Sequence, residues 1–88
     1  KIRDYRRILE AHMKELLIYI AQSLVEHPES VSVTEYETPA ETVLELRVAS
    51  EDMGKVIGRQ GRIAKEIRAL IRSVAQRQGK RVTVDIVD

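Results

Sequence analysis

Two glycines three positions apart, Gly58 and Gly61, separate two apolar helical patterns in the C-terminal half of this sequence. Only Arg59 and Gln60 lie between them, so the connection between the two helices must be a tight turn. At the end of the first helix, a residue without a Cβ adopts a left-handed conformation at little cost. This turn restricts the fold more than any other stretch, because it holds two helices close together.

The turn is also positively charged. Gly61 begins the second helix, and without a side chain it lets a sugar-phosphate backbone approach the first free N–H groups, which carry the positive end of the helix dipole. Lys55, Arg59 and Arg62 add full charges to that partial charge. These features predict a polyanionic ligand.

A Gly-x-x-Gly tetrad alone is common and often only links two helices. Here its context favours binding, because Val56 and Ile57 precede it and an Arg-Ile-x-x-x-Ile helix pattern follows it. It is not a Walker loop, since Gly61 is followed by Arg62 and not by Lys and Ser or Thr after a four-residue gap. It is not a dinucleotide fingerprint either, because the preceding Gly-x is missing and no strand runs directly into it.

Composition narrows the possible classes of protein. The 88 residues form one domain, which buries about 60% of the unfolded surface. No Cys is present, the two His residues are isolated, and no carboxylates have the spacing of metal ligands, so neither an enzyme nor a metal or cofactor site is expected. No stretch approaches the ~20 apolar residues of a membrane span, and the start does not resemble a signal peptide. We therefore predict a cytoplasmic protein with no membrane contact.

The net charge of +1 conceals an uneven distribution. Residues 55 to 81 contain nine Lys or Arg and one acidic residue, Glu66, which gives +8 for this segment and leaves −7 for the remainder. A nucleic acid would meet the basic segment. Arg72 and Arg77 lie far from the glycine turn along the chain, and we assign them to an ordinary solvated helix surface.

Residues 1–12 precede Met13, and the His12–Met13 junction resembles one left by cloning. We therefore expect residues 1–12 to be a cloning-derived helical extension and residues 13–88 to be the natural domain. The apolar residues of the extension continue the stripe of the helix that follows.

The first helix of the domain is predicted from the apolar period over residues 13–25. Pro28 should end it near Glu26 or His27, because a residue before proline is pushed out of the α region.

Strands are predicted at residues 31–37, 42–48 and 81–87, which are rich in β-branched residues or alternate apolar and polar ones. The short turn at residues 38–41 favours an antiparallel hairpin between the first two strands.

Two helices are predicted around the glycine turn. Ser50 caps the first, with Glu51 and Asp52 in its first turn. The second runs over residues 62–78 and ends at Gly79. Its predicted apolar face consists of Ile63, Ile67, Leu70, Ile71 and Val74.

The resulting order α-β-β-α-α-β predicts an α+β fold with a three-stranded mixed sheet and all helices on one face. Together with the Gly-x-x-Gly loop, this order resembles the type II, prokaryotic KH domain. The length and the motif are similar to those of the small bacterial single-KH RNA-binding proteins of the KhpA family. The resemblance covers residues 13–88.

The resemblance implies a groove between the helix–loop–helix unit and the sheet edge that holds about four unpaired nucleotides. It implies that the loop residues contact the RNA backbone and that the adjacent apolar residues form the groove floor. We add Lys55 and Arg62 to the site for their charge and position. The predicted RNA-binding residues are Lys55, Ile57, Gly58, Arg59, Gln60, Gly61 and Arg62. The three aromatic residues are Tyr5, Tyr19 and Tyr36, none of them near the loop, so base stacking is not available and binding should be weak and of low specificity.

Two functions remain open. One is a single-stranded RNA-binding protein that acts as an RNA chaperone or post-transcriptional regulator. The other is a KH-fold protein-interaction module with weak or no RNA binding of its own. The resemblance also implies a homodimer, or a heterodimer with a second KH-containing RNA-binding protein.

Overall fold

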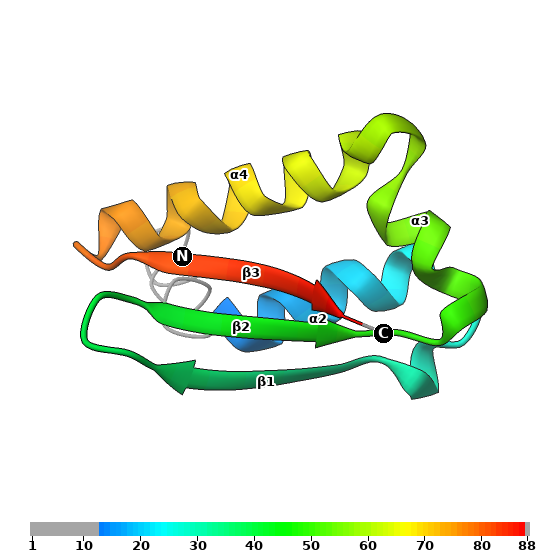
Figure 1. Cartoon of the computed structure of the whole chain (residues 1–88), viewed down its shortest axis with the longest axis horizontal. Helices are drawn as coiled ribbons and strands as arrows, with labels where there is room; N and C mark the ends of the chain where they lie inside the picture. Colours follow the sequence, from blue (N-terminus) through cyan, green and yellow to red (C-terminus); the bar gives the residue numbers. More distant parts are fainter. Residues whose placement is uncertain (1–12, 88) are drawn as a thin grey trace, which may run out of the picture.

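The computed structural model describes residues 13–87, and Figure 1 shows their arrangement. The extension predicted at residues 1–12 lies outside the described residues. The main elements in chain order are α2 (Met13–Leu24), β1 (Ser32–Glu37), β2 (Thr42–Arg47), α3 (Met53–Ile57), α4 (Arg62–Arg77) and β3 (Val82–Val87). The short 3₁₀ turns that precede β1, α3 and α4 are η1 (Pro28–Ser30), η2 (Ser50–Asp52) and η3 (Arg59–Gly61). The predicted order α-β-β-α-α-β is confirmed.

The three strands form one mixed sheet in the order β1-β2-β3. β1 and β2 pair antiparallel across the predicted hairpin, and β2 and β3 pair parallel. The parallel pair needs a crossover connection, which α3 and α4 supply. In Figure 1, α2 lies behind the sheet and α4 runs along the β3 side, so the described helices leave the front face of the sheet uncovered. The α+β class and the mixed sheet with helices on one face are as predicted.

The core lies between α2, α4 and the covered face of the sheet. Leu17 of α2, Ile71 of α4, and Leu44 and Leu46 of β2 are at most 1% exposed. Full burial of such a side chain stabilises the folded state by about 1.5–3 kcal/mol. The alternation along β2 brings both leucines to the same face of the sheet, because successive strand side chains point to opposite faces.

One residue of the predicted apolar face of α4 is not in the core. Leu70 is 47% exposed, whereas Ala64, Ile67, Ile71 and Ala75 are buried. Each helical residue advances by about 100°, so Leu70 lies a quarter-turn or more from the centre of the buried face. The two alanines on the buried face let α4 pack closely, and this rotation leaves Leu70 in solvent. The prediction that Leu70 belongs to the buried face was wrong.

The end of α2 also differs slightly from the prediction. The helix ends at Leu24, two residues before the predicted end at Glu26. The backbone N–H groups of Glu26 and His27 donate to the two carboxylate oxygens of Asp52, at 3.2 and 3.0 Å. They are therefore not available to continue the helix, and a side chain distant in sequence decides where α2 ends.

Candidate nucleic-acid interface

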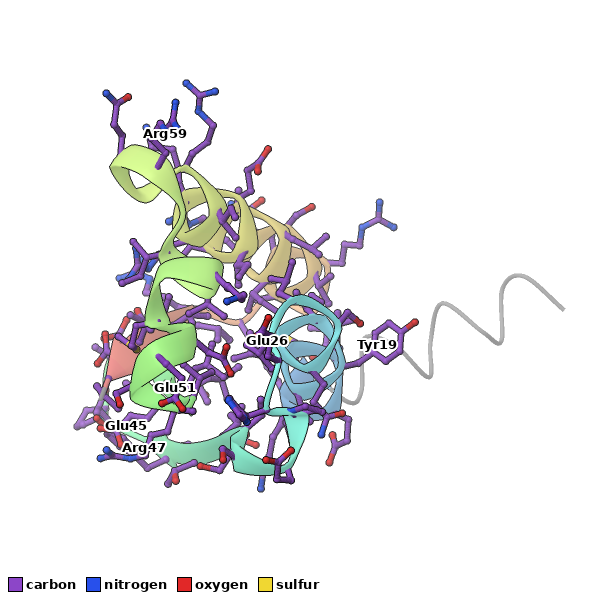
Figure 2. The ribbon with its side chains drawn as sticks, turned by 90° about the vertical axis from the view of Figure 1, so that its right-hand side faces the viewer. Tyr19, Glu26, Glu45, Arg47, Glu51 and Arg59 are labelled. Atoms are coloured by element: carbon purple, nitrogen blue, oxygen red, sulfur yellow. The ribbon has the colours of Figure 1, made fainter. Side chains whose placement is uncertain are left out.

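The glycine loop connects α3 to α4 at one end of the molecule, at the upper right of Figure 1. In the side view of Figure 2, Arg59 stands at the tip of this loop and points away from the body of the domain. Gln60, the other central residue of the loop, is exposed as well. The two residues between the glycines are thus presented to solvent.

Gly58 has a backbone conformation that only glycine adopts readily. Its φ of 77° and ψ of 172° lie in the positive-φ extended region rather than in the left-handed helical region that the sequence predicted. A Cβ at this position would lie 2.6 Å from Ile63 Cγ1 and 2.9 Å from the Ile63 backbone nitrogen. The glycine is therefore required twice, by its dihedral angles and by the close approach of Ile63.

The second half of the loop is left-handed. Gln60 has φ 58° and ψ 25°, and Gly61 has φ 73° and ψ 16°. The Gly61 N–H donates to the Gly58 carbonyl at 3.1 Å, and the Arg62 N–H donates to the Arg59 carbonyl. Two of the N–H groups that were expected to be free for phosphate are thus used inside the loop.

Open space lies beside Gly61. A Cβ at this position would meet no atom within 4 Å, in contrast to the crowded position of Gly58. Gly61 is the residue immediately before α4, so a ligand backbone can approach the N-terminal end of this helix without displacing protein atoms. The geometry leaves room for the approach predicted at Gly61, and the contact with a ligand stays a prediction.

The seven predicted site residues lie in one continuous segment around the turn, and they differ in exposure. Arg59, Gln60 and Arg62 are exposed, and Ile57 is 36% exposed at the end of α3. Lys55 is also exposed, but its Nζ lies 3.7 Å from Asp52 Oδ1, so a neighbouring carboxylate partly neutralises its charge. Arg59 and Arg62 are therefore the stronger candidates for phosphate contacts.

The burial of Asp52 was not predicted from the sequence. Its place in the first turn of the helical segment before α3 is as predicted, but Ser50 is itself the first residue of the 3₁₀ turn η2, and its hydroxyl donates to Glu51 Oε1 at 3.4 Å. Asp52 itself is completely buried. It joins the segment after α2 to the start of α3, and a lone Asp after Ser-Glu carries no sequence signal for such a long-range contact.

The Asp52 carboxyl is held in its ionised form. Burial raises its pKa, but the hydrogen bonds from the Glu26 and His27 N–H groups, together with the nearby His27 and Lys55 side chains, outweigh burial and bring the pKa below its ordinary value. A carboxyl whose pKa is lower in the folded than in the unfolded state stabilises the fold above its unfolded pKa of about 4. That stability is lost as the pH falls through the folded-state pKa.

We expect Asp52→Asn to lower the melting temperature at pH 7 by about 5 °C or more, because the amide cannot accept both backbone N–H bonds. The difference from the wild type should shrink below pH ~4, because the Asp52 carboxyl then becomes protonated in the unfolded state before it does so in the folded state. Thermal unfolding followed by circular dichroism between pH 7 and pH 2.5 measures both effects. Glu66→Gln, at an exposed carboxylate of α4, is the matched control. A difference between Asp52→Asn and wild type that stays constant down to pH 2.5 would contradict this role.

A groove of about 540 Å³ lies between the second half of α4 and the first half of β3, and none of the seven predicted site residues lines it. We name it the distal groove. Its border toward the glycine loop is formed by Arg68 of α4, whose Nε donates to the Val84 carbonyl of β3 at 3.1 Å. The hollow that the structure shows between helix and sheet edge is therefore farther from the loop than the sequence predicted.

Aromatic side chains are absent from the loop in the part of the chain described. Tyr19 is 69% exposed on α2, and in Figure 2 it points away from the body of the domain on the side opposite the loop. Tyr36 lies on β1 and donates to Glu45 Oε2 at 3.4 Å.

Within residues 13–87, no helix is long and apolar enough to cross a membrane, and no three His, Cys, Asp or Glu residues cluster as metal ligands.

The order of elements and the glycine loop between α3 and α4 define a KH domain of type II. The family model of the KhpA/KhpB KH domain matches residues 14–86. Similar proteins named RNA-binding protein KhpA occur in Clostridium acetobutylicum, 55% identical over 75 residues, and in Listeria monocytogenes, 45% identical over 76 residues. These matches cover 85% and 86% of this chain and 100% of each relative. The chain belongs to the KhpA/KhpB family of KH domains.

Solved structures with a similar fold include two chains of the protein Era. A single-residue variant of Aquifex aeolicus Era bound to GDP.AlF4- superposes with a TM-score of 0.58 at 25% identity, over 83% of this chain and 28% of that chain. Era in complex with MgGDPNP and nucleotides 1506–1542 of 16S ribosomal RNA gives a TM-score of 0.60 at 24% identity, over 89% of this chain and 30% of that one. This chain thus spans less than a third of Era, and the second likeness concerns the fold alone.

Proposed function

We propose that this chain binds single-stranded RNA through the loop Gly58-Arg59-Gln60-Gly61 and acts as an RNA chaperone or post-transcriptional regulator in the cytoplasm. The observation that carries the proposal is the exposed tip of the loop, where Arg59 and Gln60 face solvent beside the open space at Gly61. The name of the relatives, RNA-binding protein KhpA, supports RNA as the ligand class.

The binding mode follows from the groups present. Arg59 and Arg62 meet phosphates, the loop backbone clamps the strand, and the partly exposed Ile57 offers an apolar contact to a base or ribose. About four nucleotides fit such a clamp. Without an aromatic side chain at the loop, the ~1–3 kcal/mol per base that stacking provides is missing, so one domain binds weakly and with low specificity. The function is binding rather than catalysis.

The salt dependence of the affinity tests this mode. For a four-nucleotide RNA held by two or three phosphate contacts, we expect a slope of about −1.4 to −2.1 for the logarithm of the association constant against the logarithm of salt concentration. Fluorescence anisotropy with a labelled tetranucleotide at 50–300 mM KCl gives this slope. A slope near zero would contradict phosphate recognition, and one steeper than about −5 would mean that a much wider basic surface is used.

We also propose that the domain associates with a second copy of itself or with another KH-containing RNA-binding protein. Tyr19, Leu24 and Leu70 expose 69%, 37% and 47% of their surface, so each offers apolar surface whose burial against a partner would be favourable. Joining two weak sites on one RNA raises avidity by ~10²–10⁴. Sedimentation velocity of the full chain over a wide concentration range tests self-association. A monomer at all concentrations would contradict self-association and leave another KH-containing RNA-binding protein as the partner.

The same exposed apolar residues favour the second candidate function, a protein-interaction module with weak or no RNA binding. The two functions differ in one measurable result. Charge reversal at the loop removes RNA binding in the first case, whereas in the second it changes nothing and only substitutions of exposed apolar residues such as Leu70 reduce association.

A further inference from the structure

We propose that the outer edge of β1 binds an extended, Lys- or Arg-rich segment of another protein, which adds to the sheet as a further strand. The inference goes beyond the proposed function and does not depend on RNA binding. In Figure 1, β1 lies on the side of the sheet away from α4 and the glycine loop. The proposal gives a partner to the acidic part of the chain.

The first argument is the backbone of β1. It is an edge strand, since it pairs with β2 alone among the described strands. The Thr38 N–H donates to the Glu41 carbonyl at 2.8 Å, so the backbone groups of Thr38 are directed toward β2. Because these directions alternate along an antiparallel pair, the backbone groups of Val33, Glu35 and Glu37 face outward. This row of N–H and C=O groups can pair with another extended chain.

The second argument is access to this edge. All residues of β1 are exposed except Val33, whose side chain lies in the core beneath the helices. The strand packs against β2 and α2, and in Figure 1 no described element lies beyond its outer side. A new strand, which needs a spacing of about 4.8 Å from β1, therefore meets no described element there.

The third argument is charge. Residues 26–46, which include all of β1 and most of β2, contain six Glu and no Lys or Arg. Glu35 and Glu37 are exposed, and across residues 13–87 neither forms an ion pair or a side-chain hydrogen bond with another described residue. Residues of an added strand that lie directly opposite come within about 5.5 Å, where opposite charges attract. Lys or Arg at alternate positions of the added strand is therefore the complementary pattern.

The open face of the sheet supports the same choice. Tyr36, directed to this face, is 43% exposed. Partial burial raises the pKa of its phenol, and the carboxylates of Glu45, Asp85 and Glu41 raise that pKa further. The surroundings of Tyr36 are therefore negative, and a cation above an aromatic ring is favourable in itself. Both faces of the β1 edge thus suit a positively charged partner.

A second copy of the chain is a less suitable partner for this edge. When two β1 strands pair antiparallel, the register that uses all three outward residues of both copies places Glu35 directly opposite Glu35. Like charges in this position are destabilising. RNA is disfavoured by the same carboxylates. The cations of the distal groove lie at β3, the other edge of the sheet, and they are Arg68, Arg72, Lys80 and Arg81.

Nuclear magnetic resonance of the ¹⁵N-labelled chain tests the proposal with a terminally blocked peptide, Lys-Val-Lys-Thr-Lys-Val, at low salt. We expect the amide protons of Val33, Glu35 and Glu37 to shift downfield and to exchange more slowly with solvent, because they gain hydrogen bonds. The amides of Thr34 and Tyr36, which already face β2, should change much less. The same peptide with every backbone nitrogen methylated keeps the charge but has no backbone donor, and it should bind at least tenfold more weakly.

Charge variants test the recognition of Lys or Arg. Glu35→Lys should weaken peptide binding about tenfold, because an attraction across the strands becomes a repulsion. Glu37→Lys should act in the same direction. Glu66→Lys makes the same charge change at an exposed position of α4 and should change the affinity less than twofold. Melting temperatures within about 4 °C of the wild type confirm that each variant is folded.

Three results would overturn the inference. They are equal binding of the methylated peptide, equal losses for Glu35→Lys and Glu66→Lys, and amide changes that are largest away from β1. Sedimentation adds a fourth: a dimer of the wild-type chain whose stability changes in Glu35→Lys would make a second copy the occupant.

The loop variant Arg59→Asp/Gln60→Asp separates this inference from the proposed function. It should bind the peptide no more weakly than the wild type does, because its substitutions lie outside the β1 edge. Loss of peptide binding in this variant, at a normal melting temperature, would contradict the β1 site. Unchanged RNA binding in the same variant would contradict only the proposed function.

Discussion

Replacing Arg59 and Gln60 together by Asp is expected to lower RNA affinity more than 100-fold and to leave the fold intact. The two substitutions change the charge of the loop tip by three units. A unit charge about 4 Å from a phosphate contributes about 1 kcal/mol in water, so three units correspond to about 3 kcal/mol. That energy is more than a hundredfold in the dissociation constant.

The fold should tolerate this pair of substitutions because both side chains are exposed. Gln60 has a positive φ of 58°, which Asp adopts more readily than most residues. The melting temperature should therefore stay within about 4 °C of the wild-type value. Gln22→Glu with Arg77→Glu is the control, since it makes the same change of three charge units at exposed positions outside the loop. Normal affinity in the loop variant, at a normal melting temperature, would move the binding site elsewhere.

Gly58→Ala should be among the most destabilising single substitutions in the domain, at about 3 kcal/mol, although it adds only one methyl group. The added Cβ meets Ile63 Cγ1 at 2.6 Å and the Ile63 backbone nitrogen at 2.9 Å. We expect the melting temperature to fall by more than about 10 °C. Gly61→Ala, with open space around its Cβ, should cost only the ~1–2 kcal/mol of a left-handed non-glycine residue.

Urea and thermal unfolding of the two alanine variants measure this difference. Both glycines have a positive φ, 77° and 73°, so the comparison isolates the ψ angle of Gly58 and its contact with Ile63. Adding Ile63→Ala to Gly58→Ala should restore little stability, because the Ile63 Cβ and backbone nitrogen lie 2.9 Å from the new methyl group in any case. Equal losses for Gly58→Ala and Gly61→Ala would contradict this account of the loop.

Much of the fold was predictable because local patterns and tertiary packing agree. The period of apolar residues predicted α4 to within a residue of its observed end at Arg77, and the β-branched segments predicted all three strands. The helical connection between the second and third predicted strands indicated that these strands are parallel, and β2 and β3 do pair in parallel. The positive φ of Gly58 followed from its place at the end of a helix, although its ψ did not.

The features that the sequence did not predict depend on contacts between distant segments. Asp52 is buried because it accepts N–H groups 25 and 26 residues earlier in the chain, and no local pattern indicates that pairing. Leu70 belongs to the apolar stripe of α4 but lies outside its buried face, because the rotation of a helix is set by what packs beneath it. The distal groove exists only where α4 and β3 are brought together, so its cations appear in the sequence as ordinary helix and turn residues.

These long-range contacts also connect the fold to the proposed activity. Asp52 ties the segment after α2 to the start of α3, and Ile63 packs against Gly58 at the other end of that short helix. A helix of five residues has little stability of its own, so tertiary contacts at both ends hold the loop in place. If RNA binds at this loop as proposed, the loop needs no ordering beforehand, which lowers the entropic cost of binding.

The central claim is that RNA binds at the glycine loop, and nuclear magnetic resonance of the ¹⁵N-labelled chain tests it most directly. Titration with a four-nucleotide oligouridylate should produce its largest amide shift changes between residues 55 and 63. Amides on the uncovered face of the sheet, such as those of Thr34 and Glu45, should change little. Largest changes on the sheet face, with the loop amides unmoved at saturating RNA, would contradict the account.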